Sequence, residues 1–322
     1  MTFARIAGTG GYLPERVLTN KDLEQMVDTT DEWIRERSGI KRRHIAAEGE
    51  KTSDMAVIAA KKAIEAADLD VSEIDLIIVA TTTPDKVFPS TACIVQRKLG
   101  LKTIPAFDVH AACSGFIYAL DIANRFIATG GARTALIIGS ETYSRILDWT
   151  DRSTCVLFGD GAGAVVLRAS NEAGVFSTHI HSEGEFEELL HVPAGISSGY
   201  DVVQQEAAFI QMKGSEVFRK AVATLGAIAR ETLVGNNVKQ DDIAWLVPHQ
   251  ANLRIITAAA KKLGLPMERV IVTVDEHANT SSASIPLALD VAIRDGRIKR
   301  GELLLFEAFG AGFTWGSALV RY

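Results

Sequence analysis

The sequence predicts an α/β fold built from two similar halves. Short apolar runs typical of buried parallel strands, such as 75–80, alternate with segments that carry helix caps. The order of strand, glycine-rich turn and strand occurs at 135–167 and again at 303–320. No linker or low-complexity tract interrupts the chain, and we divide it into 1–173 and 174–322. The strand ends of the two halves would then meet, which is where open α/β sheets usually bind ligands.

The composition is that of a large globular protein. The 322 residues are 47% hydrophobic and 23% charged, with a mean hydropathy of +0.13, so the chain can bury an extensive core. A net charge of −6 and a pI of about 5.7 argue against general nucleic-acid binding. No apolar stretch is long enough to span a bilayer and no secretory leader is recognisable, so we expect a cytoplasmic protein without membrane contact.

The first half begins with a strand that we expect to end in a glycine-rich loop at 8–11. This loop is followed by Tyr-Leu-Pro rather than by a helix, so it does not fit a dinucleotide-binding fingerprint. Residues 29–32 have the pattern of a capping box, opening a short helix that ends at Gly39. An alanine-rich helix is expected at 53–67, and Pro89 is expected in the first turn of the next one.

The middle of the chain contains a change from strand to helix. Residues 103–109 indicate a buried strand, and from Cys113 to Gly130 the apolar residues have helical spacing. A further buried strand is expected at 135–139. The glycine cluster 158–163 is followed by a strand, which favours a tight turn over a phosphate-binding loop.

The second half follows the same plan. Residues 244–248 predict a strand that leads into a helix, as the strand ending near Val79 does in the first half. Near the C-terminus, 303–306 predicts a strand, 309–312 a glycine-rich turn and 317–320 a last strand.

Cys113 lies where the predicted strand turns into a helix. The free N–H groups of a helix start favour a thiolate by up to roughly 2 kcal/mol, which suggests a nucleophile. A free cysteine is more often a small buried hydrophobe, so this position alone leaves both interpretations open. Cys93, Cys113 and Cys155 are an odd number without C-x-x-C spacing, so we expect neither a disulfide framework nor a metal site.

Two further residues are candidate partners of the cysteine. His249 lies between a buried strand and a helix, and Asn279 lies in a polar loop before a helix, where it is either a cap or a functional amide. His110 is assigned a structural role because it adjoins a buried strand. A Cys, a His and an Asn from two halves also describe cysteine hydrolases acting on thioesters or amides, so the residue types alone do not fix the reaction.

Four motifs together carry a resemblance to a known family. In order and spacing the chain resembles the β-ketoacyl-acyl-carrier-protein synthase III family, over essentially its whole length, in the motifs Ala112-Cys113-Ser114-Gly115, Pro248-His249-Gln250-Ala251-Asn252, His277-Ala278-Asn279-Thr280-Ser281 and Phe309-Gly310-Ala311-Gly312-Phe313. The resemblance implies the thiolase fold, a five-layered α/β/α/β/α arrangement of two related halves. It also implies a homodimer and no metal or redox cofactor.

The resemblance implies a decarboxylative Claisen condensation that starts fatty-acid synthesis. Cys113 would take the acyl group of an acyl-CoA, with acetyl-CoA the family default, and malonyl-acyl carrier protein would supply the carbon nucleophile. His249 and Asn279 would stabilise the charge left by decarboxylation. The backbone N–H groups of Cys113 and Ala311 would form a second oxyanion hole, although the family commonly has glycine at the latter position. Priming of a polyketide remains an alternative, while a non-catalytic scaffold that binds carrier protein is disfavoured.

The resemblance also assigns binding residues. The coenzyme A thioester, a substrate rather than a cofactor, would contact Thr29, Trp33, Arg37, Arg152 and Asn252. The acyl pocket would be lined by Phe158 and Leu190, with Phe88 reaching across the dimer into the partner's pocket. A basic helical face would dock the acidic carrier protein, and it comprises Arg254, Lys261 and Lys262 with Arg219 from another helix.

Overall fold

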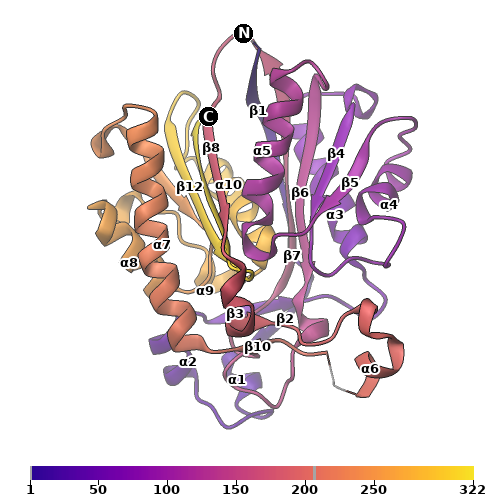
Figure 1. The fold of residues 1–322 in the computed structure, drawn as a ribbon, viewed down its shortest axis with the longest axis vertical. Coiled ribbons are helices and arrows are strands. Elements are labelled where there is room, and N and C mark those ends of the chain that lie inside the picture. Colours follow the sequence, from indigo (N-terminus) through magenta and orange to yellow (C-terminus); the bar gives the residue numbers. More distant parts are fainter. Residues whose placement is uncertain (1, 206–207) are drawn as a thin grey trace.

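The computed structural model describes residues 2–205 and 208–322, and in it two β-sheets alternate with three layers of helices (Figure 1). The first sheet has the order β1-β7-β6-β4-β5 and the second β11-β12-β13-β8. Strand bounds in the first sheet are β1 Phe3–Tyr12, β7 Asp160–Ser170, β6 Thr134–Thr142, β4 Leu76–Ala80 and β5 Ala106–Val109. Those in the second are β11 Trp245–Pro248, β12 Leu303–Gly310, β13 Thr314–Arg321 and β8 Val175–Ser182.

The hydrophobic clusters define the layers. The outer face of the first sheet packs against α3 (Thr52–Ala66) and α4 (Thr91–Lys98). The central cluster contains residues of both sheets together with α5 (Gly115–Ala128) and α10 (Ser284–Arg294), so these helices form the middle layer. The outer face of the second sheet is covered by α7 (Gly214–Gly235) and α8 (Leu253–Leu263). The arrangement is therefore the expected five-layered α/β/α/β/α fold.

Short elements complete the chain and gather mostly at the end of the molecule opposite the two termini (Figure 1). They are α1 Asn20–Leu23, α2 Asp31–Ser38, α6 Tyr200–Gln205, α9 Val274–His277, β2 Arg16–Thr19, β3 Arg42–Ile45, β9 Leu190–His191 and β10 Gln211–Met212. The 3-10 helices are η1 Val71–Glu73, η2 Ala112–Ser114, η3 Tyr143–Ile146, η4 Gly184–Leu189, η5 Ile196–Ser198, η6 Gln240–Asp242, η7 Met267–Arg269 and η8 Ser281–Ala283.

The strand order agrees with the sequence interpretation of the central strands. β4 pairs in parallel with both β5 and β6, as its continuous apolar run predicts. All strands of the first sheet come from residues 3–170 and all strands of the second from 175–321. The division at 173/174 into two related halves stays a prediction. Within the described residues, no helix has the length and hydrophobicity needed to cross a membrane.

Residues 8–11 and 160–163 lie in strands, so the loop predicted at 8–11 and the turn predicted at 158–163 are wrong for these residues. Residues 8–11 lie inside β1, where a Cβ on Gly10 would come 2.3 Å from the carbonyl oxygen of Ala59 in α3. Gly163 lies inside β7, where a Cβ would come 2.7 Å from the backbone nitrogen of Leu287 in α10. These glycines let helices lie directly on the sheet, a role that local sequence does not distinguish from a turn.

Two helix starts also differ from the prediction. The N-cap of α2 is Thr30, whose side chain accepts a hydrogen bond from the N–H of Trp33 at 3.1 Å. The third helical residue is then Trp33, whose side chain cannot return a bond, so no capping box forms. The N-cap of α4 is Ser90, which leaves Pro89 outside the helix instead of in its first turn.

Candidate active site

Cys113 lies in η2, at the start of α5, and is buried. The adjoining ends of β12 and β13 hold it from the other half of the chain. Thr314 Oγ1 donates to the carbonyl of Ala111 at 3.0 Å, and Ser114 Oγ donates to the carbonyl of Thr314 at 2.9 Å. A Cβ on Gly310 would come 2.7 Å from the backbone nitrogen of Cys113. Glycine is therefore required at 310 for the two segments to meet this closely.

The thiol of Cys113 is not acidic in its buried position. Burial raises its pKa to about 12, and the nearby hydroxyl of Ser281 only partly offsets this. The sequence interpretation, in which the helix start favours a thiolate, is wrong because desolvation outweighs a helix-dipole effect of at most about one and a half pKa units. Acylation of Cys113 therefore requires a group that accepts its proton.

His249 follows β11 and is 4% exposed. Its backbone N–H donates to the carbonyl of Glu307 at 2.8 Å, and its Nδ1 lies 2.6 Å from Oγ of Ser284 in α10. Burial lowers the pKa of His249 to about 3, so the imidazole is neutral at physiological pH. Because Nδ1 is committed to Ser284, Nε2 is the nitrogen left to bind a ligand.

Asn279 is held through both its backbone and its side chain. Its N–H donates to the carbonyl of Leu157 at 2.9 Å, and its carbonyl accepts from the N–H of Gly159 at 3.0 Å. Its Oδ1 accepts the N–H of Ser281 at 2.8 Å. This bond uses the acceptor of the amide and leaves the NH₂ group as the free donor. Because Ser281 is the first residue of η8, this bond also caps that turn, so the cap and the functional amide considered from the sequence are compatible.

The backbone around these residues is strained. Among the described residues, six non-glycine residues have positive φ, and three of them adjoin the candidate site: Ala112 at 44°, Ala278 at 58° and Ser281 at 50°. Conformations of this kind cost of order 1–3 kcal/mol each and persist where the surroundings enforce them, often at functional sites. Ala311, which replaces the family's glycine, is not one of the six, so its methyl group fits the backbone.

Cys113, His249 and Asn279 line one small cavity of about 80 Å³. Asn252 also lines it, while its Oδ1 accepts from the N–H of Ile255 as the N-cap of α8. The remaining lining is mostly apolar: Leu157, Phe158, Leu190, Met212, Gly214, Val217, Phe218, Ala221, Leu225, Ala251, Ile255, Phe309 and Gly310. Both predicted pocket residues of this chain, Phe158 and Leu190, are therefore present.

Phe88 does not line this cavity. It lies between β4 and α4 and is 83% exposed, next to the exposed Val87. His110, expected to be structural because it adjoins a buried strand, is exposed beyond the end of β5, and β5 itself is only half-buried. The reason given for its structural role is therefore wrong.

The residues predicted to bind coenzyme A gather around Trp33 in α2. The guanidinium carbon of Arg152 lies 5.1 Å from the centroid of the indole and that of Arg37 lies 5.6 Å from it. Oγ1 of Thr29 is buried without a hydrogen-bond partner among the described residues. Gly39 ends α2 with a φ of 79° and lies directly against Leu253, the first residue of α8. This contact places the Trp33 cluster beside the end of α8 that carries Asn252.

The predicted basic face is exposed on α7 and α8. Arg219, Arg254, Lys261 and Lys262 are all solvent-exposed. The guanidinium carbon of Arg254 lies 5.3 Å from the centroid of Phe218, which lines the cavity, so Arg254 stands beside it. The stem of Lys262 packs over Gly226 of α7.

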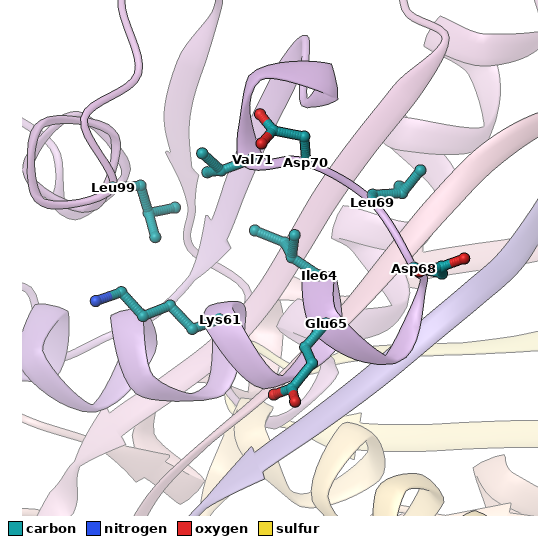
Figure 2. A pocket seen from close by; sticks show the side chains of 8 residues that line it. All are labelled: Lys61, Ile64, Glu65, Asp68, Leu69, Asp70, Val71 and Leu99. Atoms are coloured by element: carbon teal, nitrogen blue, oxygen red, sulfur yellow. The ribbon is translucent and has the colours of Figure 1, made fainter.

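A larger surface hollow of about 580 Å³ lies elsewhere and has no comparable chemistry. Its charged side chains point apart, with Lys61, Glu65 and Asp68 directed away from one another (Figure 2). It lies at the end of α3 that precedes the amino end of β4, whereas Cys113 follows the carboxyl end of the neighbouring strand β5. In the described part of the chain, no group of three or more His, Cys, Asp or Glu residues is placed to hold a metal ion.

Three residues at the site were missed from the sequence. Ser284 contacts His249, Ser281 contacts Asn279 and lowers the pKa of Cys113, and Glu141 accepts a hydrogen bond from Ser281. A carboxyl group near the end of a predicted buried strand was the available signal for Glu141. The serines had no such signal, because a run of serines before a helix is equally typical of a cap.

The layered fold and the site of Cys, His and Asn define a thiolase-fold condensing enzyme. Models of 3-oxoacyl-[acyl-carrier-protein] synthase III match residues 107–184, and those of its C-terminal region match 233–322. A β-ketoacyl-[acyl-carrier-protein] synthase III of Thioalkalivibrio sulfidiphilus is 64% identical over the full length of both chains. The chain therefore belongs to the 3-oxoacyl-[acyl-carrier-protein] synthase III family.

Solved structures agree with this assignment. The 3-oxoacyl-[acyl-carrier-protein] synthase III of Aquifex aeolicus is 52% identical and superposes with a TM-score of 0.94, over 99% of this chain and 100% of that one. The priming β-ketosynthase of the R1128 polyketide pathway is 37% identical, with a TM-score of 0.95 over 99% of this chain and 96% of that one.

Proposed function

We propose that this protein condenses an acyl-CoA primer with malonyl-acyl carrier protein, with Cys113 as the acylated nucleophile. The observation that carries the proposal is that Cys113, His249 and Asn279 line one small cavity. The hydrogen bonds that hold His249 and Asn279 leave Nε2–H of His249 and the NH₂ group of Asn279 to donate to a substrate. Relatives at 59–64% identity carry the synthase III name, which favours a role at the start of fatty-acid synthesis over polyketide priming.

In the first half-reaction the sulfur of Cys113 attacks the thioester carbonyl of acyl-CoA. The tetrahedral oxygen binds the backbone N–H groups of Cys113 and Ala311, and CoA leaves as the thiol. One thioester replaces another, so the exchange is nearly isoenergetic. Gly310 keeps the turn that carries Ala311 against Cys113, because any Cβ at position 310 would collide with the cysteine backbone.

In the second half-reaction the malonyl thioester loses CO₂. The electron pair of the broken C–C bond moves onto the thioester oxygen, where His249 Nε2–H and the Asn279 NH₂ donate hydrogen bonds. A preorganised donor of this kind typically contributes roughly 10²–10³ in rate. The α-carbon then attacks the acyl group on Cys113, forming the 3-oxoacyl thioester and releasing the cysteine sulfur.

The residues around the cavity suit coenzyme A, an acidic carrier protein and a short acyl group. The Trp33 cluster suits the adenine and phosphates of CoA, and the basic face of α7 and α8 suits an acidic carrier protein. The cavity is small and mostly apolar, which favours a short primer such as acetyl-CoA. The exposed Phe88 suits insertion into the pocket of a second copy in a homodimer. We place this reaction in the cytoplasm and assign it no metal or redox cofactor.

Two variants test this function against a cysteine hydrolase. We expect Cys113→Ala to form no acyl-enzyme yet still decarboxylate malonyl-acyl carrier protein. We expect His249→Ala to acylate on Cys113 but to decarboxylate at least 10²-fold more slowly. Acyl-enzyme is measured by intact mass, and CO₂ release is followed with labelled malonyl groups. If both variants lose only hydrolysis of a thioester and the wild type forms no 3-oxoacyl product, the hydrolase explanation is correct.

A further inference from the structure

A buried carboxyl group lies behind Cys113. Glu141 is in β6 and has no exposed surface. Ser281 lies between it and the cysteine, because η8, which begins with Ser281, packs against η2, and the Oγ of Ser281 lies 3.2 Å from Oε1 of Glu141. The Ser281 hydroxyl, which lowers the pKa of the Cys113 thiol, is therefore placed to link the thiol to the carboxyl group. The condensation described above uses neither Ser281 nor Glu141.

One carboxyl oxygen of Glu141 has fixed donors. Oε2 accepts the N–H of Thr82 at 3.0 Å and the hydroxyls of Thr83 at 2.7 Å and Thr81 at 3.2 Å. Thr83 Oγ1 itself accepts the N–H of Thr142, and Thr81 Oγ1 accepts the N–H of Thr83. Because these hydroxyl oxygens already accept from backbone groups, their hydrogens are directed to Oε2. Oε2 is therefore the permanent acceptor of the pair.

The other oxygen has partners that can rotate. Oε1 lies 3.2 Å from the hydroxyl of Ser281 and 3.1 Å from that of Ser282. Each serine has an alternative acceptor, the Tyr143 hydroxyl at 3.0 Å for Ser281 and the Ala80 carbonyl at 2.8 Å for Ser282. With Glu141 ionised, Ser281 donates to Oε1. With a proton on Oε1, Glu141 donates to Ser282, which donates to Ala80, and Ser281 donates to Tyr143.

We propose that Glu141, acting through the hydroxyl of Ser281, accepts the proton that Cys113 loses on acylation and returns it when the cysteine is released. The inference rests on the proposed role of Cys113 as the acylated nucleophile. It assigns Ser281 as the group that contacts the reacting thiol and Glu141 as the proton acceptor behind it. Both protonation states of Glu141 satisfy the surrounding hydroxyl groups, so the transfer requires only rotation of hydroxyls.

The proton balance closes over one catalytic cycle. On acylation the S–H bond of Cys113 breaks and the sulfur bonds to the acyl carbon. The thiol proton passes to Ser281 Oγ while the Ser281 hydroxyl proton passes to Oε1, and the departing CoA thiolate takes a proton from solvent. On condensation the tetrahedral intermediate expels the Cys113 thiolate. The thiolate then regains a proton from Ser281 as Glu141 returns its own.

The electrostatics agree with this role. Burial raises the pKa of Glu141 above its ordinary value, which makes the carboxylate a stronger base, and burial raises the pKa of Cys113 to about 12. The titratable groups against Glu141 are the Cys113 thiol and the Tyr143 phenol, whose pKa burial also raises well above its ordinary value. Its contacts from the segment after β4 and from η8 are neutral N–H and O–H groups. His249, with a pKa of about 3 and Nδ1 committed to Ser284, is a poor alternative acceptor.

The test compares acylation rates of the full-length protein with acetyl-CoA from pH 6 to 9, by rapid quench and intact mass. Glu141→Gln keeps the size of the side chain but cannot accept the proton, and Ser281→Ala interrupts the relay. We expect each to acylate about 10²-fold or more slowly at pH 7, the usual contribution of general base catalysis. Glu141→Asp should recover part of the rate. Ser140→Ala is the matched control, since it removes a buried hydroxyl from the neighbouring position of β6 that bonds to Thr52 instead.

The pH profile distinguishes the relay from a structural role. Wild-type acylation should fall as the pH drops through the raised pKa of Glu141 and level off above it. Both relay variants should instead gain close to tenfold per pH unit up to pH 9, because their thiol must ionise directly. Thermal melting identifies any variant that fails to fold, and Ser281→Ala then carries the test in place of Glu141→Gln. Variants that fold and match the wild-type rate and profile would overturn the relay alone. A wild type that acquires no acyl group on Cys113 would overturn the relay together with the proposed function.

Discussion

The Nδ1 atom of His249 lies 2.6 Å from the hydroxyl of Ser284, which also accepts the N–H of Gln250 at 3.3 Å. Since the Ser284 oxygen accepts from this backbone group, its hydrogen is free to point at Nδ1. A neutral imidazole that accepts at Nδ1 carries its hydrogen on Nε2. The bond therefore orients the ring and sets the tautomer that the decarboxylation step requires.

Replacing Ser284 should affect only the malonyl half-reaction. We expect Ser284→Ala to slow decarboxylation about fivefold, because the ring loses an orienting hydrogen bond that contributes about 1 kcal/mol. Acylation of Cys113 should stay within a factor of two, and Ser284→Thr, which retains a hydroxyl, should restore most of the rate. Separate assays of acyl-enzyme formation and CO₂ release check this. Equal losses in both half-reactions would show that Ser284 acts on the fold rather than on His249.

Gly310 should be intolerant of any side chain. We expect Gly310→Ala to reduce acylation by at least 10²-fold, because the added Cβ would meet the Cys113 backbone nitrogen at 2.7 Å and displace an oxyanion donor. Gly195→Ala is the control, since a Cβ there has no atom within 4 Å. Intact mass after incubation with acetyl-CoA reports both. Normal acylation of Gly310→Ala would contradict the position assigned to Ala311.

The Trp33 cluster should recognise only the nucleotide end of CoA. We expect Trp33→Ala to raise KM for acetyl-CoA by about 5- to 100-fold with little change in kcat, because the variant loses the stacking of one base. Acetyl-pantetheine lacks the nucleotide, so its kinetics should be the same for the variant and the wild type. A comparable loss with both substrates would place the effect of Trp33 in folding or in the cavity instead.

Glu307 makes the stability of the protein depend on pH. It is fully buried in β12, neither of its carboxyl oxygens has a partner among the described residues, and burial raises its pKa to about 8. An unfolded glutamate ionises near pH 4.5, so between pH 4.5 and 8 the folded state binds more protons and stability falls as the pH rises.

The amide of Glu307→Gln resembles the protonated form of the glutamate. We therefore expect this variant to be more stable than the wild type at pH 8, by on the order of a few kcal/mol, and the difference to shrink towards pH 5. Thermal melting at several pH values measures it, with Glu268→Gln on the exposed η7 as the control. A difference that is constant with pH would show that Glu307 is ionised in the folded protein.

The sequence predicted the buried strands better than the contacts between helices and sheets. Apolar runs such as 75–80 identified the central strands because burial on both faces leaves a continuous hydrophobic signal. Gly10 and Gly163 were misassigned because a glycine that admits a helix against a strand looks the same locally as one that makes a turn. Only the position of α3 and α10, which are distant in sequence, distinguishes the two.

The sequence identified the residues of the candidate site but did not predict their pKa values. Cys113, His249 and Asn279 were identified from motifs, whereas the raised pKa of Cys113 follows from complete burial, which no local pattern reveals. The same holds for Glu141, whose partners Thr82, Thr83 and Ser281 come from two separate segments. A network of this kind exists only once the two halves are packed together.

The most direct test of the whole account is the mass of the protein before and after each substrate. With acetyl-CoA alone, we predict that one acetyl group appears on the peptide containing Cys113 and persists. On addition of malonyl-acyl carrier protein the acetyl group should leave the protein and reappear in a 3-oxoacyl carrier protein, with release of one CO₂. Acetylation at another residue, or loss of the acetyl group to water as acetate at the same rate with and without malonyl-acyl carrier protein, would contradict the proposal.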